Sequence, residues 1–340
     1  MSTLTPPKAA AVPDAPATAA PGSLRGPVRV LLRLHRRSLW GAGAFLAAAV
    51  VVLVAAALRA DYLVADFANS GCTRDGSVRS CFQPARNYAD SMLELSRIPD
   101  YASLVLIVLP AVVGAFVAGP LIAREWENGT FRLSWTQSVS PVQWLTARLA
   151  TPAVLVASGT LVLTAVLAWA RPRAGAEYPA AWYEWFSFTA SGTVPVANVL
   201  LALALGTLIG LRLRRTVPAM ALTVLTYGAV AVALYSVRDS LWATRSEVSG
   251  VFSHRESLHN GWTIGIGYLT DAGERLPAET CLASDRTRNC LAELGAHRQF
   301  AEYHPASHYW PLQLVETGIL LALAALAVFL AFRTLRRLHG

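Results

Sequence analysis

Long stretches of the chain are almost entirely apolar or small, and each reaches the roughly 20 residues that a helix needs to cross about 30 Å of hydrocarbon. Five contain an uncharged run of that length, and the sixth carries Glu316 near one end. The predicted spans are residues 38–58, 101–123, 147–170, 190–211, 217–237 and 312–332. The pattern therefore predicts an all-α integral membrane protein with a six-span transmembrane domain over residues 25–337.

Composition and charge agree with a membrane protein. The chain is 54% apolar and 15% charged, with a mean hydropathy of +0.42, which is not the balance of a soluble protein. A net charge of +8 could indicate a nucleic-acid partner, but the basic residues follow the membrane pattern instead. With the N-terminus inside, the cytoplasmic segments hold about half of the basic residues and only Asp14, Glu125 and Glu127 of the acidic ones. We predict both termini in the cytoplasm, outer loops at 61–100 and 238–311, and no nucleic-acid partner.

The region before the first span divides into two parts. Residues 1–24 are rich in Pro and Ala with few large apolar side chains, so we predict a disordered cytoplasmic tail. The following segment places Arg29, Arg33, Arg36 and Arg37 within about 100° of arc on a helix, opposite apolar residues. This pattern is typical of an interfacial helix whose arginines contact lipid phosphates, although a simple basic flank that orients the first span would have the same charge.

All four cysteines lie in the predicted outer loops, in two pairs separated by nine residues: Cys72 with Cys81, and Cys281 with Cys290. Four cysteines allow three pairings. An oxidising exterior and short closure favour the two local disulfides. The alternatives are free thiols and, less favoured because no CxxC spacing is present, zinc ligation.

Two further patterns each have two interpretations. Aromatic residues gather before the fourth span, where they form an interfacial belt or contact a substrate. They are Trp182, Tyr183, Trp185, Phe186 and Phe188.

Within the fourth span, Gly206 and Gly210 form a GxxxG motif, which permits close helix contact inside one bundle or between two copies.

The sequence offers no chemistry of its own for powering transport. A Walker A loop needs a lysine at the phosphates, and the chain's single lysine is Lys8 in the predicted tail. Ion-coupled transporters usually carry ionisable residues within their spans, whereas Arg148 and Glu316 lie toward span ends. The histidines of the last outer loop have no metal-site or catalytic spacing, and His304 with His308 lacks the Glu of a HExxH site. We predict that the chain is not an enzyme and holds no metal or cofactor.

The most informative polar segment follows the second span, in the predicted cytoplasmic loop. Its two glutamates oppose the positive-inside bias, so a partner is a better explanation than topology. Asn128, Gly129 and Thr130 have turn and N-cap chemistry, which predicts a short helix from about Thr130 to Val139. The candidate site residues are Arg124, Glu125, Trp126, Glu127, Asn128, Gly129 and Thr130.

These residues resemble a motif of the membrane subunits of bacterial ABC transporters in the type-2 permease superfamily. Residues 124–130 look like that family's ExExGT stretch, and Thr136–Ser140 is similar to the turn that leads into its third span. Residues 303–316 are similar to the segment before the last span in actinobacterial members. The first outer loop is longer than in minimal members of the family.

The resemblance implies a bacterial plasma-membrane exporter. The segment from Glu125 to Val139 would dock into a separate cytoplasmic ATPase, which binds the ATP and magnesium, and two permease subunits, identical or related, would form the pathway. The apolar spans suit an amphipathic or hydrophobic solute. Two other interpretations stay open: an ion-coupled secondary transporter, and a membrane anchor or sensor that transports nothing.

Overall fold

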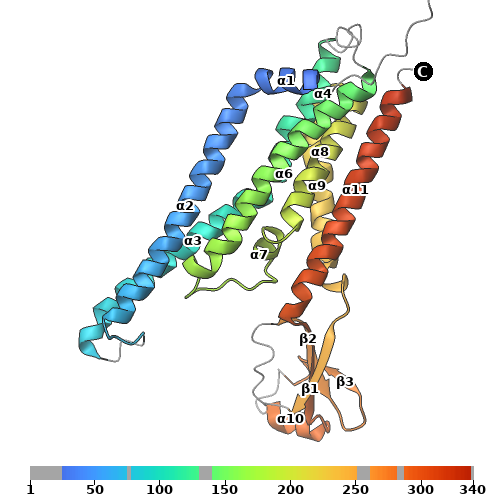
Figure 1. The fold of residues 1–340 in the computed structure, drawn as a ribbon. Coiled ribbons are helices and arrows are strands. Elements are labelled where there is room, and N and C mark those ends of the chain that lie inside the picture. Colours follow the sequence, from blue (N-terminus) through green and yellow to red (C-terminus); the bar gives the residue numbers. More distant parts are fainter. Residues whose placement is uncertain (1–24, 75–77, 130–139, 251–260, 282–286, 338–340) are drawn as a thin grey trace, which may run out of the picture.

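A helical bundle forms most of the structure, with a small sheet at one end (Figure 1). The computed structural model describes residues 25–74, 78–129, 140–250, 261–281 and 287–337. The predicted tail at 1–24 and the predicted short helix at 130–139 lie outside these residues. Helix α1 (Arg25–Leu34) and the C-terminal end of α11 (Tyr309–Arg337) lie at one end of the bundle, here called the α1 end, and the sheet lies at the other, the sheet end.

Six helical segments are long and apolar enough to cross a membrane, as predicted. The first is α2 (Arg36–Asn69) and the third is α6 (Pro141–Ala174). The second comprises α3 (Phe82–Val113), the π-helical turn η2 (Gly114–Ala118) and α4 (Gly119–Glu127). The remaining three are α8 (Val194–Leu213), α9 (Thr216–Val237) and α11. All but α8 are longer than the predicted spans, α9 by one residue only, because the predictions marked the apolar part of each helix.

Helix α8 lies at the centre of the bundle. It packs against α3, α4, α6, α9 and α11. In its most apolar stretch of 18 residues, 72% is buried, against 17% in the corresponding stretches of α2 and α9. An apolar helix that is buried on all sides belongs in a protein core, whereas the exposed apolar faces of α2 and α9 suit contact with lipid. The structure therefore separates an internal span from peripheral ones.

Glycines bring α8 close to the second span within the same chain. A Cβ atom at Gly206 would lie 2.7 Å from Ala118 Cβ and 2.9 Å from the Gly114 carbonyl oxygen. One at Gly210 would lie 3.1 Å from the Gly119 carbonyl oxygen. The GxxxG motif thus serves a contact inside the bundle, at the level of the π-helical turn.

Replacing Gly206 with Ala is expected to lower the stability of the fold by about 1–3 kcal/mol, because the new methyl group overpacks this crossing. Gly228→Ala is the matched control, since a Cβ there meets nothing within 4 Å. Thermal unfolding of both purified variants in detergent checks the prediction. Equal melting temperatures would contradict it.

The segment predicted as the first outer loop, 61–100, is largely helical. Helix α2 continues to Asn69, and α3 begins at Phe82 after a short 3₁₀ turn, η1 (Arg79–Cys81). At 1.5 Å per residue, α2 is about 51 Å long, well beyond the hydrocarbon thickness. The extension is stabilised by stacking of Phe67 on Tyr88, whose ring centroids lie 4.4 Å apart. Charged residues here therefore belong to helices that extend beyond the membrane rather than to a loop.

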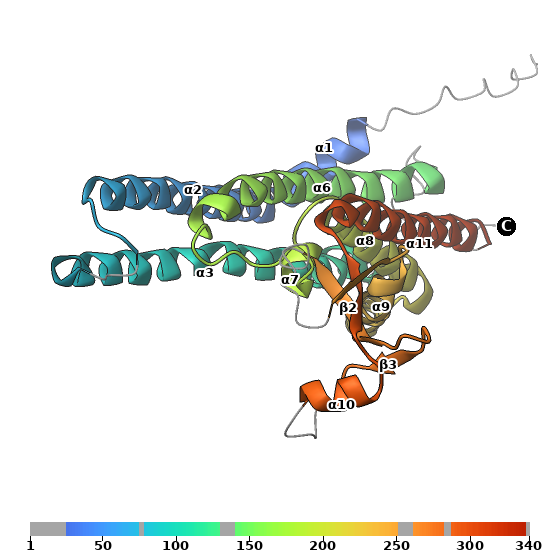
Figure 2. The same cartoon turned by 90° about the horizontal axis from the view of Figure 1, so that it is seen from below.

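The second predicted outer loop, 238–311, contains a four-stranded antiparallel sheet in the order β1-β4-β2-β3, so the all-α prediction is wrong for this region (Figure 2). The strands are β1 (Arg245–Gly250), β2 (Trp262–Leu269), β3 (Arg275–Pro277) and β4 (Arg298–His304). Two 3₁₀ turns, η3 (Arg238–Ser240) and η5 (Ala306–His308), connect this region to α9 and α11. Aromatic and β-branched residues favour the strand conformation in β2, which lies within a region predicted only as an outer loop.

Both local disulfides are present. Cys72 is bonded to Cys81, where it closes the connection between α2 and α3, and Cys281 is bonded to Cys290 in the short helix α10 (Thr287–Glu293). Cys281 packs with Leu291 and Ala296 in a small core beneath the sheet. The favoured pairing is thus confirmed.

Candidate functional site

Helix α4 ends at a glycine turn at the α1 end of the bundle. Gly129 has φ = +69°, a left-handed conformation that favours glycine, and its N–H donates to the Trp126 carbonyl oxygen. The Asn128 N–H donates to the Arg124 carbonyl oxygen, and both of these side chains are exposed. The predicted turn at Asn128 and Gly129 is confirmed, while Thr130 lies outside the described residues.

Glu125 is engaged with the start of α6. Its carboxylate forms an ion pair with Arg148 and accepts a hydrogen bond from Trp144 Nε1 at 3.1 Å. The side chains of Glu125 and Arg148 are only 17% and 18% exposed. Trp144 and Arg148 are four residues apart, so they occupy one face of α6. That helix begins with a capping box, in which Ser140 and Gln143 exchange hydrogen bonds.

Glu127 is engaged with the start of α9. Its Oε2 accepts hydrogen bonds from the Thr216 N–H at 3.2 Å and from Thr216 Oγ1 at 2.7 Å. A carboxylate is well placed there, because the first N–H groups of a helix have no partner within the helix. Beside it, the Arg214 guanidinium lies 4.7 Å from the centre of the Trp126 ring. The end of α4 therefore contacts both the start of α9 and the link that precedes it.

The predicted site residues thus form one junction, here called the α4 junction: residues 124–129 with their partners Trp144, Arg148, Arg214 and Thr216. Sequence reasoning anticipated carboxylates with a partner. The structure gives both glutamates partners within the chain, on two different spans. One of these contacts could have been predicted from the sequence. Arg148 lies near the start of the third span and Glu125 near the end of the second, on the two sides of one loop, and their charges are opposite.

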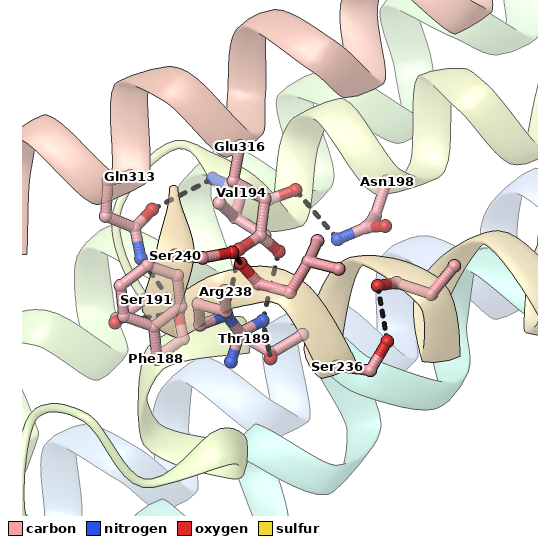
Figure 3. Close-up of polar contacts among 12 residues, drawn as sticks. Phe188, Thr189, Ser191, Val194, Asn198, Ser236, Arg238, Ser240, Gln313 and Glu316 are labelled. Atoms are coloured by element: carbon pink, nitrogen blue, oxygen red, sulfur yellow. Dashed lines mark hydrogen bonds and ion pairs between the residues drawn. The ribbon is translucent and has the colours of Figure 1, made fainter. Parts of the chain in front are cut away.

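A second polar cluster lies at the sheet end, and the sequence did not reveal it. Arg238 donates from Nε to Glu316 Oε2 at 2.9 Å and from Nη2 to Glu316 Oε1 at 3.0 Å (Figure 3). Nη2 also donates to Thr189 Oγ1 at 3.1 Å, and the guanidinium lies 4.3 Å from the centre of the Phe188 ring. The side chains of Arg238 and Glu316 are 4% and 3% exposed, so this is a buried, charge-neutral pair.

Gln313, one helical turn before Glu316, holds the turn between α7 (Trp185–Thr189) and α8. Its Nε2 donates to the Phe188 carbonyl oxygen at 2.9 Å, and its Oε1 accepts from the Val194 N–H at 3.3 Å (Figure 3). Gly192 has φ = +65° and lies so close that a Cβ there would be 2.6 Å from Gln313 Oε1. Residues from α7, α8, η3 and α11 are therefore fixed to one another.

Within the described ranges, no group of three or more His, Cys, Asp or Glu side chains is placed to hold a metal ion. His304 and His308 lie side by side, with their Nδ1 atoms 3.0 Å apart, and His304 Nε2 lies 2.9 Å from the Asp239 carbonyl oxygen. They form a buried structural pair at the start of α11.

Six apolar helices, a buried internal span and exposed apolar faces define the chain as a multi-pass membrane protein. The sequence model of the family described as ABC-2 membrane transporter related matches residues 43–238, more than half of the chain. The chain therefore belongs to this family, whose membrane-embedded members are the permease part of ABC transporters. No curated protein and no solved structure matches the chain.

Proposed function

We propose that the chain is the permease subunit of an ATP-driven exporter that moves an amphipathic or hydrophobic solute across the bacterial plasma membrane. A separate cytoplasmic ATPase would hydrolyse ATP, and two permease subunits, identical or related, would enclose the pathway. The family supports the transporter class. The observation that carries the coupling role is the α4 junction, where one exposed corner contacts two other spans.

The junction suits the transmission of movement. A displacement of the end of α4 would reach α6 through Glu125 and Arg148, and α9 through Glu127 and Thr216. Charge-assisted hydrogen bonds are directional and among the stronger non-covalent contacts, so they transmit a shift better than apolar packing alone. Because both glutamates have partners in the chain, their role would be to position the spans, while Arg124, Asn128 and Gly129 lie toward the ATPase.

The first test is to purify the tagged full-length chain in mild detergent, identify co-purifying proteins by mass spectrometry, and assay ATP hydrolysis. A stoichiometric ATPase with Walker motifs is the expected result. A solitary protein without nucleotide-dependent activity would favour the anchor or sensor. Transport that persists without an ATPase and collapses with an ionophore would favour an ion-coupled transporter.

Glu127→Ala is expected to lower permease-stimulated ATP hydrolysis severalfold, because it removes both hydrogen bonds from Thr216 and leaves the end of α4 joined to α9 by apolar packing. The pair is exposed, so little change in melting temperature is expected. Glu94→Ala, which removes an exposed carboxylate from α3, is the matched control. Hydrolysis and solute uptake into inverted vesicles are the measurements, and equal activity of the two variants would overturn the role of Glu127.

A further inference from the structure

A cavity of about 410 Å³ lies beside the buried Arg238–Glu316 pair. Its walls are mainly aromatic and come from three separate parts of the chain: the segment that leads into α7, the end of α9, and β2. The aromatic residues are Tyr183, Trp185, Phe186, Tyr235 and Trp262. A cavity of this size accepts a small organic molecule, and apolar walls with few polar groups are typical of ligand sites.

The aromatic walls are held in place by contacts with one another. The rings of Tyr183 and Trp262 are nearly parallel, with an interplanar angle of 4° and centroids 6.1 Å apart. Trp182 packs edge-on against both of them. Since Tyr183 and Trp262 are fixed by such contacts, this part of the wall would need little ordering on binding, which favours affinity.

Arg238 and Glu184 are the charged residues that line this cavity, and Arg238 offers a hydrogen-bond donor. Its Nε and Nη2 are engaged by Glu316 and Thr189, but Nη1 is buried and has no hydrogen-bond partner within the part of the chain that the structure describes. Buried donors without a partner are uncommon in native proteins, and each needs an explanation. An acceptor atom on a bound molecule would complete the hydrogen bonds of the guanidinium.

The unsatisfied donor of Arg238 favours a hydrogen-bond acceptor over a cation. Glu184 also lines the cavity, and Arg171, which interacts electrostatically with Glu184, forms its ion pair with Asp100 at 3.5 Å. Glu316 balances the charge of Arg238. The unsatisfied group is therefore a donor, and a cation would leave it unsatisfied.

We propose that this cavity is a binding site for a flat aromatic or amphipathic solute whose carboxylate or carbonyl oxygen accepts a hydrogen bond from Arg238 Nη1 while the aromatic rings contact its apolar part. The site lies at the sheet end of the bundle, opposite the α4 junction (Figure 1). Contact with a substrate was the second interpretation of the aromatic residues at 182–188. The proposed site adopts this interpretation and adds Tyr235 and Trp262.

The test uses the full-length chain in lipid nanodiscs, with 2-naphthoate titrated by isothermal calorimetry and empty nanodiscs as the blank. Trp262→Ala is expected to weaken binding about tenfold, because it removes one aromatic wall. Trp310→Ala is the matched control, since Trp310 is 56% exposed at the start of α11 and does not line the cavity. Heats equal to the blank, or equal affinities of the two variants, would overturn the site.

A second comparison tests the role of Arg238. 2-Naphthoate is expected to bind more tightly than 2-naphthylmethylammonium, and R238Q/E316Q is expected to lose this preference while it leaves no unpaired charge. A preference for the ammonium compound in the unsubstituted protein would overturn the assignment to an acceptor. The measurement needs no ATPase, so it decides this proposal even if the transport proposal fails.

Discussion

Replacing Arg238 with Met is expected to destabilise the fold by about 3–5 kcal/mol, because it leaves the Glu316 carboxylate buried without its counter-ion. Arg238 makes two hydrogen bonds to Glu316 and one to Thr189, and all three would be lost together. The measurement is thermal and denaturant-induced unfolding of the purified protein in detergent. A large loss of monodisperse protein on size-exclusion chromatography should accompany it.

Arg275→Met is the matched control for this prediction. Arg275 pairs with Glu302 between β3 and β4 at 2.7 Å, but the two side chains are 60% and 36% exposed. Exposed ion pairs contribute at most about 1 kcal/mol. The double variant R238M/E316L should recover much of the lost stability, since it removes both charges together. If R238M were as mild as R275M, the buried pair would not hold α9 to α11.

The spans show how far the sequence predicted this fold. Hydropathy placed all six, because an apolar run of about 20 residues with at most one charge has no other common explanation. It could not place their ends. Helix α2 runs to Asn69 because Asp61 and Asp66 are tolerated in a helix once it leaves the hydrocarbon, and hydropathy stops at the last apolar residue.

The sheet and the buried ion pair were missed for a different reason. Large apolar residues alternate with Thr and Gly over residues 262–268, which is a strand pattern, but the whole region had been predicted only as an outer loop. Arg238 was interpreted as the first residue of an outer loop, although it follows span five directly. Arg238 lies at the end of one span and Glu316 at a similar depth in another, which is consistent with an ion pair. Such a pair can be predicted only when it is known which spans are neighbours.

The α4 junction was predicted in part. The candidate residues are at the end of the second span, but the partner expected for the glutamates was a separate ATPase, whereas the structure gives them partners on other spans of the same chain. The partners themselves come from Trp144, Arg148 and Thr216, which are 19 to 89 positions away in the sequence. Contacts of that separation depend on how the spans pack, and a local motif carries no information about them.

The interaction of Glu125 with Arg148 supports the prediction that bears most directly on the proposed function. Glu125→Arg and Arg148→Glu are each expected to lower stimulated ATP hydrolysis and transport about tenfold or more, because each breaks a charge-assisted contact of about 1.5–3 kcal/mol and places like charges together. The double variant, which exchanges the two charges, is expected to recover most of this loss. Trp144 would still lack its carboxylate acceptor at position 125, so the recovery would be incomplete.

The exchange separates coupling from folding, because all three variants can be compared by melting temperature before their activity is compared. In a double-mutant cycle, recovery in the exchanged variant measures the interaction itself rather than the separate cost of either substitution. Singles that melt like the unsubstituted protein and have lost stimulated hydrolysis would place Glu125 and Arg148 on the route from the ATPase to α6. Full activity of either single variant, or a double variant no better than the singles, would show that movement reaches the spans by another contact, and the interaction of Glu127 with Thr216 would then be the remaining route in this junction.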